Sequence, residues 1–319
     1  MDLLLVVAAA AAAVAALVLI AAYICYRMAF YSPKRKPNPD GGINLPQGEQ
    51  YRPYWEKMLR WAEETRARPQ RELSVRSFDG LTLRGTYYEY APDAPIELMF
   101  HGYRGSTQRD LAGGVQRCFK LGHSALLVDQ RAHGRSEGKT ITFGVYEHRD
   151  CLSWLKLMLQ EFGPDVKIIL TGISMGAATV MMAAGRPLPK QVVGVLADCG
   201  YTSPKEIICE VIGKMGLPPA VVYPFVKLGA RVFGGFDPDS WSAREAMAQC
   251  KVPVIFFHGQ ADQFVPCHMS QSNYEACTGV KQLVIMETAG HGLCYPVEPQ
   301  RYLAEAKKFW AENHGNDEK

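Results

Sequence analysis

The sequence lacks the cysteine spacings that mark a disulfide framework or a zinc site. Its nine cysteines are an odd number, no two of them form a CxxC pair, and no cysteine–histidine ligand cluster is present. A disulfide framework needs paired cysteines, and structural zinc sites need closely spaced thiols and imidazoles. We therefore expect buried free thiols, as in a reducing compartment, and no metal site.

A strong excess of charge is also missing from most of the chain. There are 35 Lys and Arg residues against 32 Asp and Glu residues, which gives a net charge of +3. Residues 1–36 hold four basic residues and one acidic residue, so they carry the whole excess. Domains that bind nucleic acid carry a basic face. The sequence therefore predicts no nucleic-acid partner.

Disorder, low complexity and internal repeats are absent as well. Apolar residues make up 48% of the chain, charged residues 21% and aromatic residues 10%. This ordinary globular composition excludes a mainly disordered or collagen-like protein. The 319 residues suffice for one large domain or two small ones, with a core that needs no disulfides.

One long apolar segment is present at the start of the sequence. Leu3 to Tyr26 is unbroken by charge and long enough to cross a hydrocarbon core of ~30 Å as a helix, and Arg27 ends it. We expect a single-pass membrane anchor over residues 1–30. A cleaved signal peptide is the alternative, but no basic residue precedes the run and the run exceeds a usual signal core. The positive charge that follows predicts a cytoplasmic main domain.

Residues 31–48 (YSPKRKPNPDGGINLPQG) are rich in proline, glycine and charge. Such a composition predicts a linker between the anchor and the main domain. Lys34 to Lys36 either contact anionic lipid headgroups or form a solvated flank of the anchor, and the sequence does not separate these readings.

Short apolar runs alternate with helix-like stretches over residues 49–319. Apolar residues at helical spacing predict a helix within residues 51–68, and Glu72–Ser77 with Leu81–Tyr90 predict a hairpin around Asp79-Gly80. Continuous apolar strands are typical of a sheet that is buried on both faces. We expect an α/β fold with a mostly parallel eight-stranded sheet and helices on both faces. The later strands are Ile96–Phe100, Ala125–Val128, Val166–Leu170, Val192–Ala197, Val252–Phe257 and Gln282–Met286.

Residues 200–245 interrupt this alternation. They are rich in glycine, proline and aromatic residues, with short helical pieces and no clear strand. They lie between two predicted strands, where a small helical cap fits. A pair of ordinary crossover helices is the alternative.

The sequence around Ser174 predicts a catalytic nucleophile. Gly172-Ile173-Ser174-Met175-Gly176 is a G-x-S-x-G pattern between a predicted strand and an alanine-rich helix. The glycines allow a sharp turn from strand to helix, which presents the serine at the helix N-terminus. Backbone N–H groups there favour developing negative charge.

A serine nucleophile needs a base and a carboxylate that orients the base. In this topology the order along the chain is serine, acid, histidine. Asp262 follows the strand VPVIFFHG, and His291 follows the strand LVIME, so both lie at carboxyl ends of strands. We expect Ser174, Asp262 and His291 to form the catalytic triad.

An oxyanion hole needs two preorganised donors. We expect the backbone N–H of Met175, directly after the nucleophile, and the N–H of Tyr103 in the loop His101-Gly102-Tyr103-Arg104-Gly105. The side chains of Tyr103 and Arg104 are candidates to bind substrate at the entrance. His101 is expected to support the loop, and Cys294 to lie near the site without acting as a nucleophile.

Residues 72 to 312 resemble the α/β-hydrolase superfamily. The segments HGYRGS, DQRAHGRSEG, GISMG, HGQADQFVP and AGHG stand in that family's order. Within DQRAHGRSEG (129–138), the resemblance implies that Asp129, Arg131, His133 and Ser136 fix a loop. The set is most similar to membrane-anchored serine hydrolases described as esterase, lipase or acylaminoacyl-peptidase-like. HGYRG departs from the HGGG loop of many lipases, and Ser174 excludes the relatives that place Asp or Cys at the elbow.

These residues predict acyl transfer through an acyl-enzyme, with no cofactor and no metal. The expected substrate is a small-molecule or lipid acyl ester or thioester. A peptidase or amidase with the same triad is an alternative, and a non-catalytic interaction scaffold is a third reading from another class. The family resemblance does not identify the substrate, because this fold carries many chemistries. The oligomeric state also stays open.

Overall fold

An eight-stranded sheet forms the centre of the computed structural model, which describes residues 3–33 and 43–313. The strand order is β1-β2-β4-β3-β5-β6-β7-β8. Strand β2 pairs antiparallel with β1 and β4, and all other neighbours are parallel. The predicted mostly parallel sheet is therefore confirmed. The strands are β1 Arg71–Arg76, β2 Thr82–Tyr88, β3 Ile96–Phe100, β4 Ser124–Asp129, β5 Ile168–Ile173, β6 Val192–Asp198, β7 Val254–Gly259 and β8 Lys281–Met286.

The central strands are buried on both faces, as their mostly apolar sequence requires. All residues of β3 and β4 are buried. Because side chains alternate along a strand, Leu98 and Phe100 belong to one core cluster, whereas Met99 belongs to another on the opposite face.

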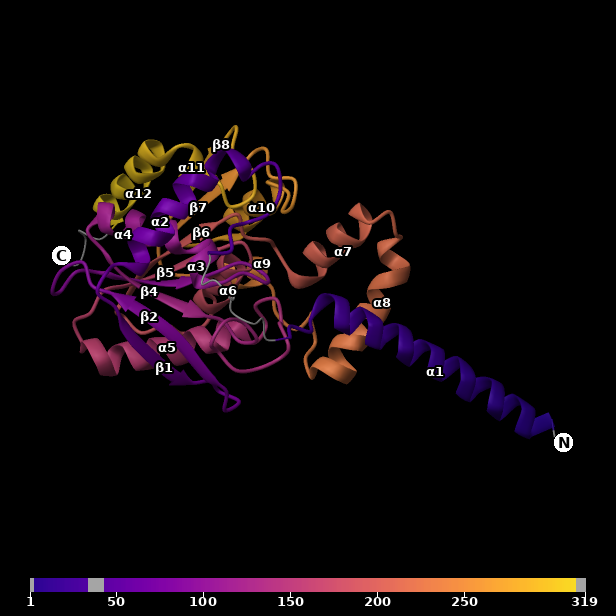
Figure 1. Cartoon of the computed structure of the whole chain (residues 1–319). Coiled ribbons are helices and arrows are strands. Elements are labelled where there is room, and N and C mark those ends of the chain that lie inside the picture. Colours follow the sequence, from indigo (N-terminus) through magenta and orange to yellow (C-terminus); the bar gives the residue numbers. More distant parts are fainter. Residues whose placement is uncertain (1–2, 34–42, 314–319) are drawn as a thin grey trace.

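Helices cover both faces of the sheet (Figure 1). On one face α5 and α6 pack together, and α6 contacts β3, β5 and β6. On the other face α2 and α12 both contact α4. The predicted layers are confirmed. These helices are α2 Trp55–Arg66, α4 Ala112–Leu121, α5 Glu147–Phe162, α6 Met175–Ala184, α9 Ala243–Met247, α10 His268–Ala276 and α12 Pro299–Asn313; the short turns are η1 Arg52–Tyr54, α3 Thr107–Asp110 and α11 Cys294–Val297.

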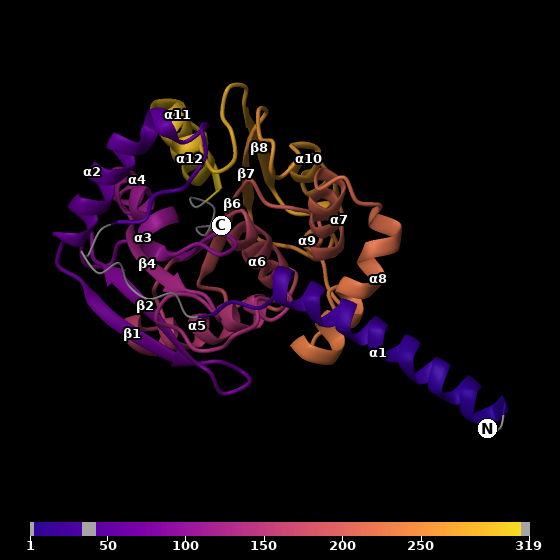
Figure 2. The same ribbon diagram turned by 45° about the vertical axis from the view of Figure 1, so that its right-hand side comes forward.

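Helix α1 (Leu3–Ala29) projects away from the body, and its N-terminal end is the most distant part of the molecule in both overall views (Figure 1 and Figure 2). It is long and apolar enough to cross a membrane, and its most hydrophobic stretch is unburied, so it is a candidate membrane span. The helix is nevertheless joined to the fold at its other end. Phe30 is fully buried, with ring contacts to Phe143 and Phe236. The predicted linker begins at this junction, and its residues 34–42 lie outside the described residues.

The segment between β6 and β7 contains helices and no strand within its described residues. It forms α7 Pro204–Lys214, α8 Pro219–Gly229, η2 Ala230–Gly234 and α9. Figure 2 shows α8 beside the end of α1 that is nearest the body. The two helices approach so closely that a Cβ built on Gly229 would lie 2.3 Å from the carbonyl oxygen of Ala22. The residues predicted as a cap therefore pack against α1.

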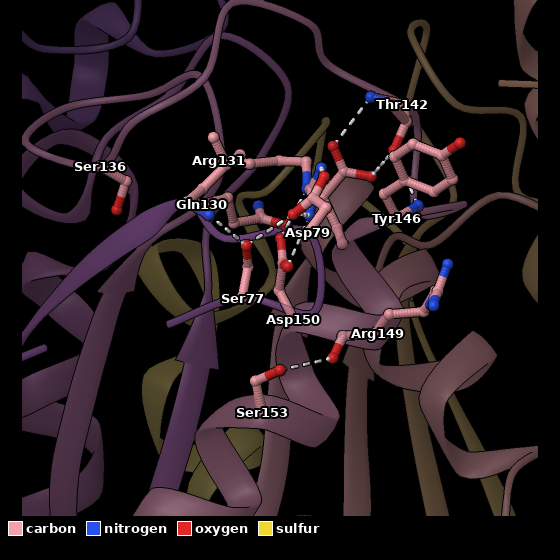
Figure 3. A network of polar contacts seen from close by, with 12 residues as sticks. Ser77, Asp79, Gln130, Arg131, Ser136, Thr142, Tyr146, Arg149, Asp150 and Ser153 are labelled. Atoms are coloured by element: carbon pink, nitrogen blue, oxygen red, sulfur yellow. Dashed lines mark hydrogen bonds and ion pairs between the residues drawn. The ribbon is translucent and has the colours of Figure 1, made fainter. Parts of the chain in front are cut away.

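A buried arginine fixes the turn that follows β4 (Figure 3). Arg131 donates to both carboxylate oxygens of Asp150, at 2.6 and 2.7 Å, and to both oxygens of Asp79. Arg131 and Asp150 are almost fully buried. Burial raises the pKa of Asp150, while the charge of Arg131 opposes this shift. These contacts agree with the role in fixing the loop that the family resemblance implies for Arg131.

Replacing Arg131 with methionine is expected to lower the free energy of unfolding by about 3–5 kcal/mol, because it leaves the buried Asp150 carboxyl without its partner. Denaturant unfolding of the detergent-solubilised protein measures this loss. Arg71→Met is the matched control, since its pair with Glu161 is exposed and is expected to contribute less than about 1 kcal/mol. Equal losses in the two variants would contradict the structural role of Arg131.

Candidate active site

Ser174 lies in the sharp turn between β5 and α6. Its backbone has φ 57° and ψ −118°, a conformation that is unusual for a residue with a side chain. Two neighbouring glycines make the turn possible. A Cβ on Gly172 would lie 2.2 Å from the backbone of Gly176, and one on Gly176 would lie 2.0 Å from the carbonyl oxygen of Phe100. The predicted elbow is thus held against the end of β3.

The structure brings Ser174, His291 and Asp262 into one chain of hydrogen bonds. His291 Nε2 lies 2.9 Å from Ser174 Oγ, and His291 Nδ1 lies 2.7 Å from Asp262 Oδ2. Ser174 and Asp262 are 6% and 8% exposed, so both are shielded from water. The three residues come from the carboxyl ends of β5, β7 and β8, which meet at one edge of the sheet.

The Asp262 carboxylate is oriented by its own loop. The N–H groups of Phe264 and Val265 donate to Oδ1 at 2.8 and 2.9 Å, which leaves Oδ2 for His291. The buried His258 adds a contact of 3.4 Å to Oδ2. Burial favours the neutral acid, but His258 and His291 outweigh it and lower the pKa of Asp262 well below its usual range. Asp262 is therefore ionised at neutral pH. The sequence pattern did not single out His258.

The loop after β3 lies directly beside Ser174. A Cβ on Gly102 would lie 3.4 Å from Ser174 Cβ, so the loop backbone passes close to the nucleophile. Asp110 of α3 accepts the Gly102 N–H at 3.1 Å. His101 is fully buried, with Nδ1 2.8 Å from the Gly102 carbonyl oxygen and Nε2 accepting the Gln130 N–H. These contacts fit the supporting role expected of His101.

The side chains of Tyr103 and Arg104 both reach the end of α1. Tyr103 Oη donates to the Ala29 carbonyl oxygen at 2.7 Å, and Arg104 donates to the carbonyl oxygens of Met28 and Tyr31 at 2.8 and 3.2 Å. A positive side chain is favourable at a helix C-terminus. Tyr103 also lines the cavity at Ser174, whereas Arg104 does not. The expectation that Arg104 binds substrate does not fit these contacts.

A cavity of about 350 Å³ opens at Ser174 and His291. Most of its lining surface is apolar, with Tyr51, Met58 and Trp61 from the N-terminal segment and Leu111 and Tyr295 from elements on the same face. None of its lining residues belongs to 200–245. The helical spacing predicted α2, but no signal in the sequence indicated that α2 and the residues before η1 line the cavity.

Comparison with known proteins identifies the family. The model of the alpha/beta hydrolase family matches residues 98–279, more than half of the chain. The chain belongs to the alpha/beta hydrolase family. The uncharacterized protein YqkD of Bacillus subtilis is 27% identical over 233 residues, which are 72% of this chain and 75% of YqkD. Thiohydrolase aneE of Aspergillus aculeatus is 28% identical over 153 residues, 45% of this chain and 46% of aneE.

Among solved structures, the Pyrococcus furiosus esterase Pf2001 is similar to this hydrolase. The TM-score is 0.64 with 21% sequence identity, and the match covers 86% of this chain and 98% of the esterase. At that identity the likeness shows the shared fold. Together with the family match it makes this chain a hydrolase by family and fold.

One group of possible metal ligands is present among the described residues of the hydrolase: Cys199, Asp262 and His291. Burial, together with the charges of Asp198 and Asp262, raises the pKa of the Cys199 thiol well above its usual value. A protonated thiol is a poor metal ligand. Asp262 and His291 are already hydrogen-bonded to each other. Burial likewise raises the pKa of Cys294 far above its usual value, which fits a neighbour of the site and not a nucleophile.

Proposed function

We propose that this hydrolase cleaves carboxylic esters or thioesters through Ser174, His291 and Asp262. The hydrogen-bonded chain from Ser174 Oγ through both ring nitrogens of His291 to the ionised Asp262 is the observation that supports it most directly. The family model and the likeness to an esterase and to a thiohydrolase agree with this chemistry.

The mechanism is a two-step acyl transfer. Ser174 Oγ attacks the carbonyl carbon as His291 Nε2 takes its proton, and His291 then gives that proton to the departing alcohol or thiol. Water attacks the acyl-enzyme, again with His291 as base, and releases the acid and Ser174. The N–H groups of Met175 and Tyr103 stabilise the oxyanion, by about 3–4 kcal/mol for each donor.

The cavity favours an apolar acyl or leaving group. Met58, Trp61 and Leu111 line the cavity that opens at Ser174, and most of its lining surface is apolar. A peptide or amide is the second candidate, since the same triad can protonate an amine. The apolar lining and the thiohydrolase relative favour an ester or thioester.

Helix α1 is proposed to anchor the enzyme in a membrane. Arg27 follows its apolar residues, and the basic residues 34–36 come shortly after it in the sequence. Positive flanks stay in the cytoplasm, so the catalytic domain is proposed to be cytoplasmic. The substrate is then a small-molecule or lipid acyl ester that reaches the cytoplasmic side of the membrane.

The test is kcat/KM for p-nitrophenyl esters from acetyl to palmitoyl, measured in detergent with Ser174→Ala beside the parent protein. Activity that peaks at medium or long acyl chains and vanishes in Ser174→Ala supports the proposal. A kcat/KM that is highest for the acetyl ester would indicate a small closed pocket. Absence of ester hydrolysis together with cleavage of p-nitroanilides would favour the amidase.

The contact between Tyr103 and α1 predicts a positioning effect on catalysis. Tyr103→Phe removes the hydroxyl that donates to Ala29 but keeps the ring and the backbone N–H. We expect kcat to fall about tenfold with KM nearly unchanged, because small displacements of a catalytic group are costly. Tyr146→Phe is the matched control, since it removes a hydroxyl that donates to the Gly235 carbonyl oxygen, away from Ser174. Equal kcat in the two variants would refute the positioning role.

A further inference from the structure

Exposed apolar side chains are concentrated between α7 and η2. Outside α1, ten large apolar residues of the described chain are exposed, and five of them fall within residues 215–233. Single exposed apolar residues are normal, whereas a concentration on one segment marks an interaction surface. We name these five the insertion surface: Met215, Leu217, Val221, Val232 and Phe233, with exposed fractions of 54%, 44%, 61%, 52% and 38%.

The C-terminal end of the insertion surface, at Phe233, is fixed next to α1. The Phe233 ring lies 5.1 Å from the ring of Tyr23, in an edge-on contact, and 6.1 Å from the ring of Tyr26. Gly229 lets α8 approach the α1 backbone at Ala22, a contact that small residues make possible between closely packed helices. Figure 2 shows α8 and η2 around the same stretch of α1, with the N-terminal end of α1 pointing away.

The length of α1 gives the depth of this contact. A helix crosses the hydrocarbon core with about 20 residues, so a span that begins at Leu3 ends near Ala22. Ala22 is the residue that faces Gly229. Helix α8 and its flanks therefore lie at the boundary between hydrocarbon and headgroups. Tyr23 and Arg27, just beyond, are residue types that favour this interface.

We propose that the insertion surface is a second membrane contact, in which α8 and its flanks lie in the lipid interface beside α1. This inference rests on the proposed membrane span of α1. Its occupant is the bilayer, because the surface continues the unburied apolar face of α1 at the depth where lipid begins. Charged side chains of the same segment are paired, Lys227 with Asp239 and Arg231 with Asp237.

This contact brings the active-site loop near the lipid. Lys214, at the end of α7, donates to the carbonyl oxygens of Gln263 and Phe264. Phe264 lines the cavity, and its ring lies 5.1 Å from that of His291. The segment that rests on the membrane is thus bound to the loop that holds Asp262. The arrangement suits acyl substrates that enter the cavity from the bilayer.

The test uses tryptophan quenching in the full-length protein. Leu217→Trp and Phe233→Trp are reconstituted in nanodiscs of phosphatidylcholine, with or without bromine on acyl carbons 6 and 7, and the signal of the parent protein's five tryptophans is subtracted. Val14→Trp reports α1 itself. Tyr90→Trp is the control. Tyr90 is exposed and follows β2, whose last residue pairs with Ala125 at the amino end of β4. It therefore lies on the side of the sheet opposite to the carboxyl strand ends that carry the triad.

We expect bromine to lower the added fluorescence by about half at Leu217→Trp, Phe233→Trp and Val14→Trp, and not at Tyr90→Trp, since interfacial helices bury their apolar face ~5–10 Å deep. Quenching at Val14→Trp alone overturns the second contact and leaves the span of α1 standing. No quenching at any site overturns both. The fluorescence of the added tryptophans could instead change with the protein-to-lipid ratio and not with bromine. That result would assign the surface to contact with a second copy of this chain, which also overturns the proposal. Leu217 lies in an exposed turn, so its variant tests the proposal even if Phe233→Trp misfolds.

Discussion

Replacing Ser174 with alanine is expected to lower kcat for ester hydrolysis by about three or more orders of magnitude. The substitution removes the only atom that His291 Nε2 contacts in the triad and leaves the fold of the elbow unchanged, because the strained backbone is held by Gly172 and Gly176. Steady-state kinetics measure the loss. Labelling with a fluorophosphonate, followed by intact-mass analysis, tests the nucleophile directly.

Ser203→Ala is the matched control for this experiment. Ser203 is the N-cap of α7, where its side chain accepts the Glu206 N–H, and it does not line the cavity. We expect full labelling and nearly full kcat, with a loss of stability of about 1 kcal/mol from the missing cap. Fluorophosphonate labelling that persists in Ser174→Ala would exclude Ser174 as the nucleophile. A folded parent protein that takes no label would favour the scaffold interpretation.

The local sequence predicted the elbow because its geometry is a local property. Gly172 and Gly176 flank Ser174 within five residues. A side chain on Gly172 would collide with the backbone of Gly176, and a side chain on Gly176 would collide with the end of β3. The common location of Ser174, Asp262 and His291 follows from the parallel sheet, whose carboxyl strand ends meet at one edge. Both kinds of information are present in spacing and pattern.

Contacts between distant segments were not predictable in the same way. The apolar spacing of α2 indicates that one face is buried, but not that Met58 and Trp61 border the cavity at Ser174. Tyr103 and Arg104 were assigned to the entrance because their loop carries an oxyanion donor. Both side chains bind carbonyl oxygens about 75 residues earlier in the chain, and Tyr103 lines the cavity while Arg104 does not. The packing of α1 against the domain determines where these two side chains lie.

The same packing explains why residues 200–245 do not line the cavity. Their glycine, proline and aromatic content predicts short helices, which the structure contains as α7 and α8. Gly229, however, fits against Ala22, and Phe233 packs against Tyr23, so the segment is directed toward α1. Composition indicates a helical insertion but not which neighbour it covers.

Asp262→Asn is expected to lower kcat about 10⁴-fold, by analogy with the same change in another serine hydrolase triad. Oδ1 of residue 262 accepts the N–H groups of Phe264 and Val265, so an asparagine places its carbonyl oxygen there and its NH₂ group toward His291. His291 Nδ1 must then accept a hydrogen bond, which moves the ring proton to Nε2. In that tautomer His291 cannot accept the proton of Ser174.

Asp198→Asn is the matched control for Asp262→Asn. Asp198 is a second buried carboxyl of the cavity, at the end of β6, and its Oδ2 accepts from Tyr302, not from His291. Burial raises the pKa of Asp198, so its neutral amide analogue is a mild change. We expect kcat within about threefold of the parent, because the triad hydrogen bonds are untouched. A loss in Asp198→Asn as large as that in Asp262→Asn would assign the orienting acid to β6 and contradict the triad.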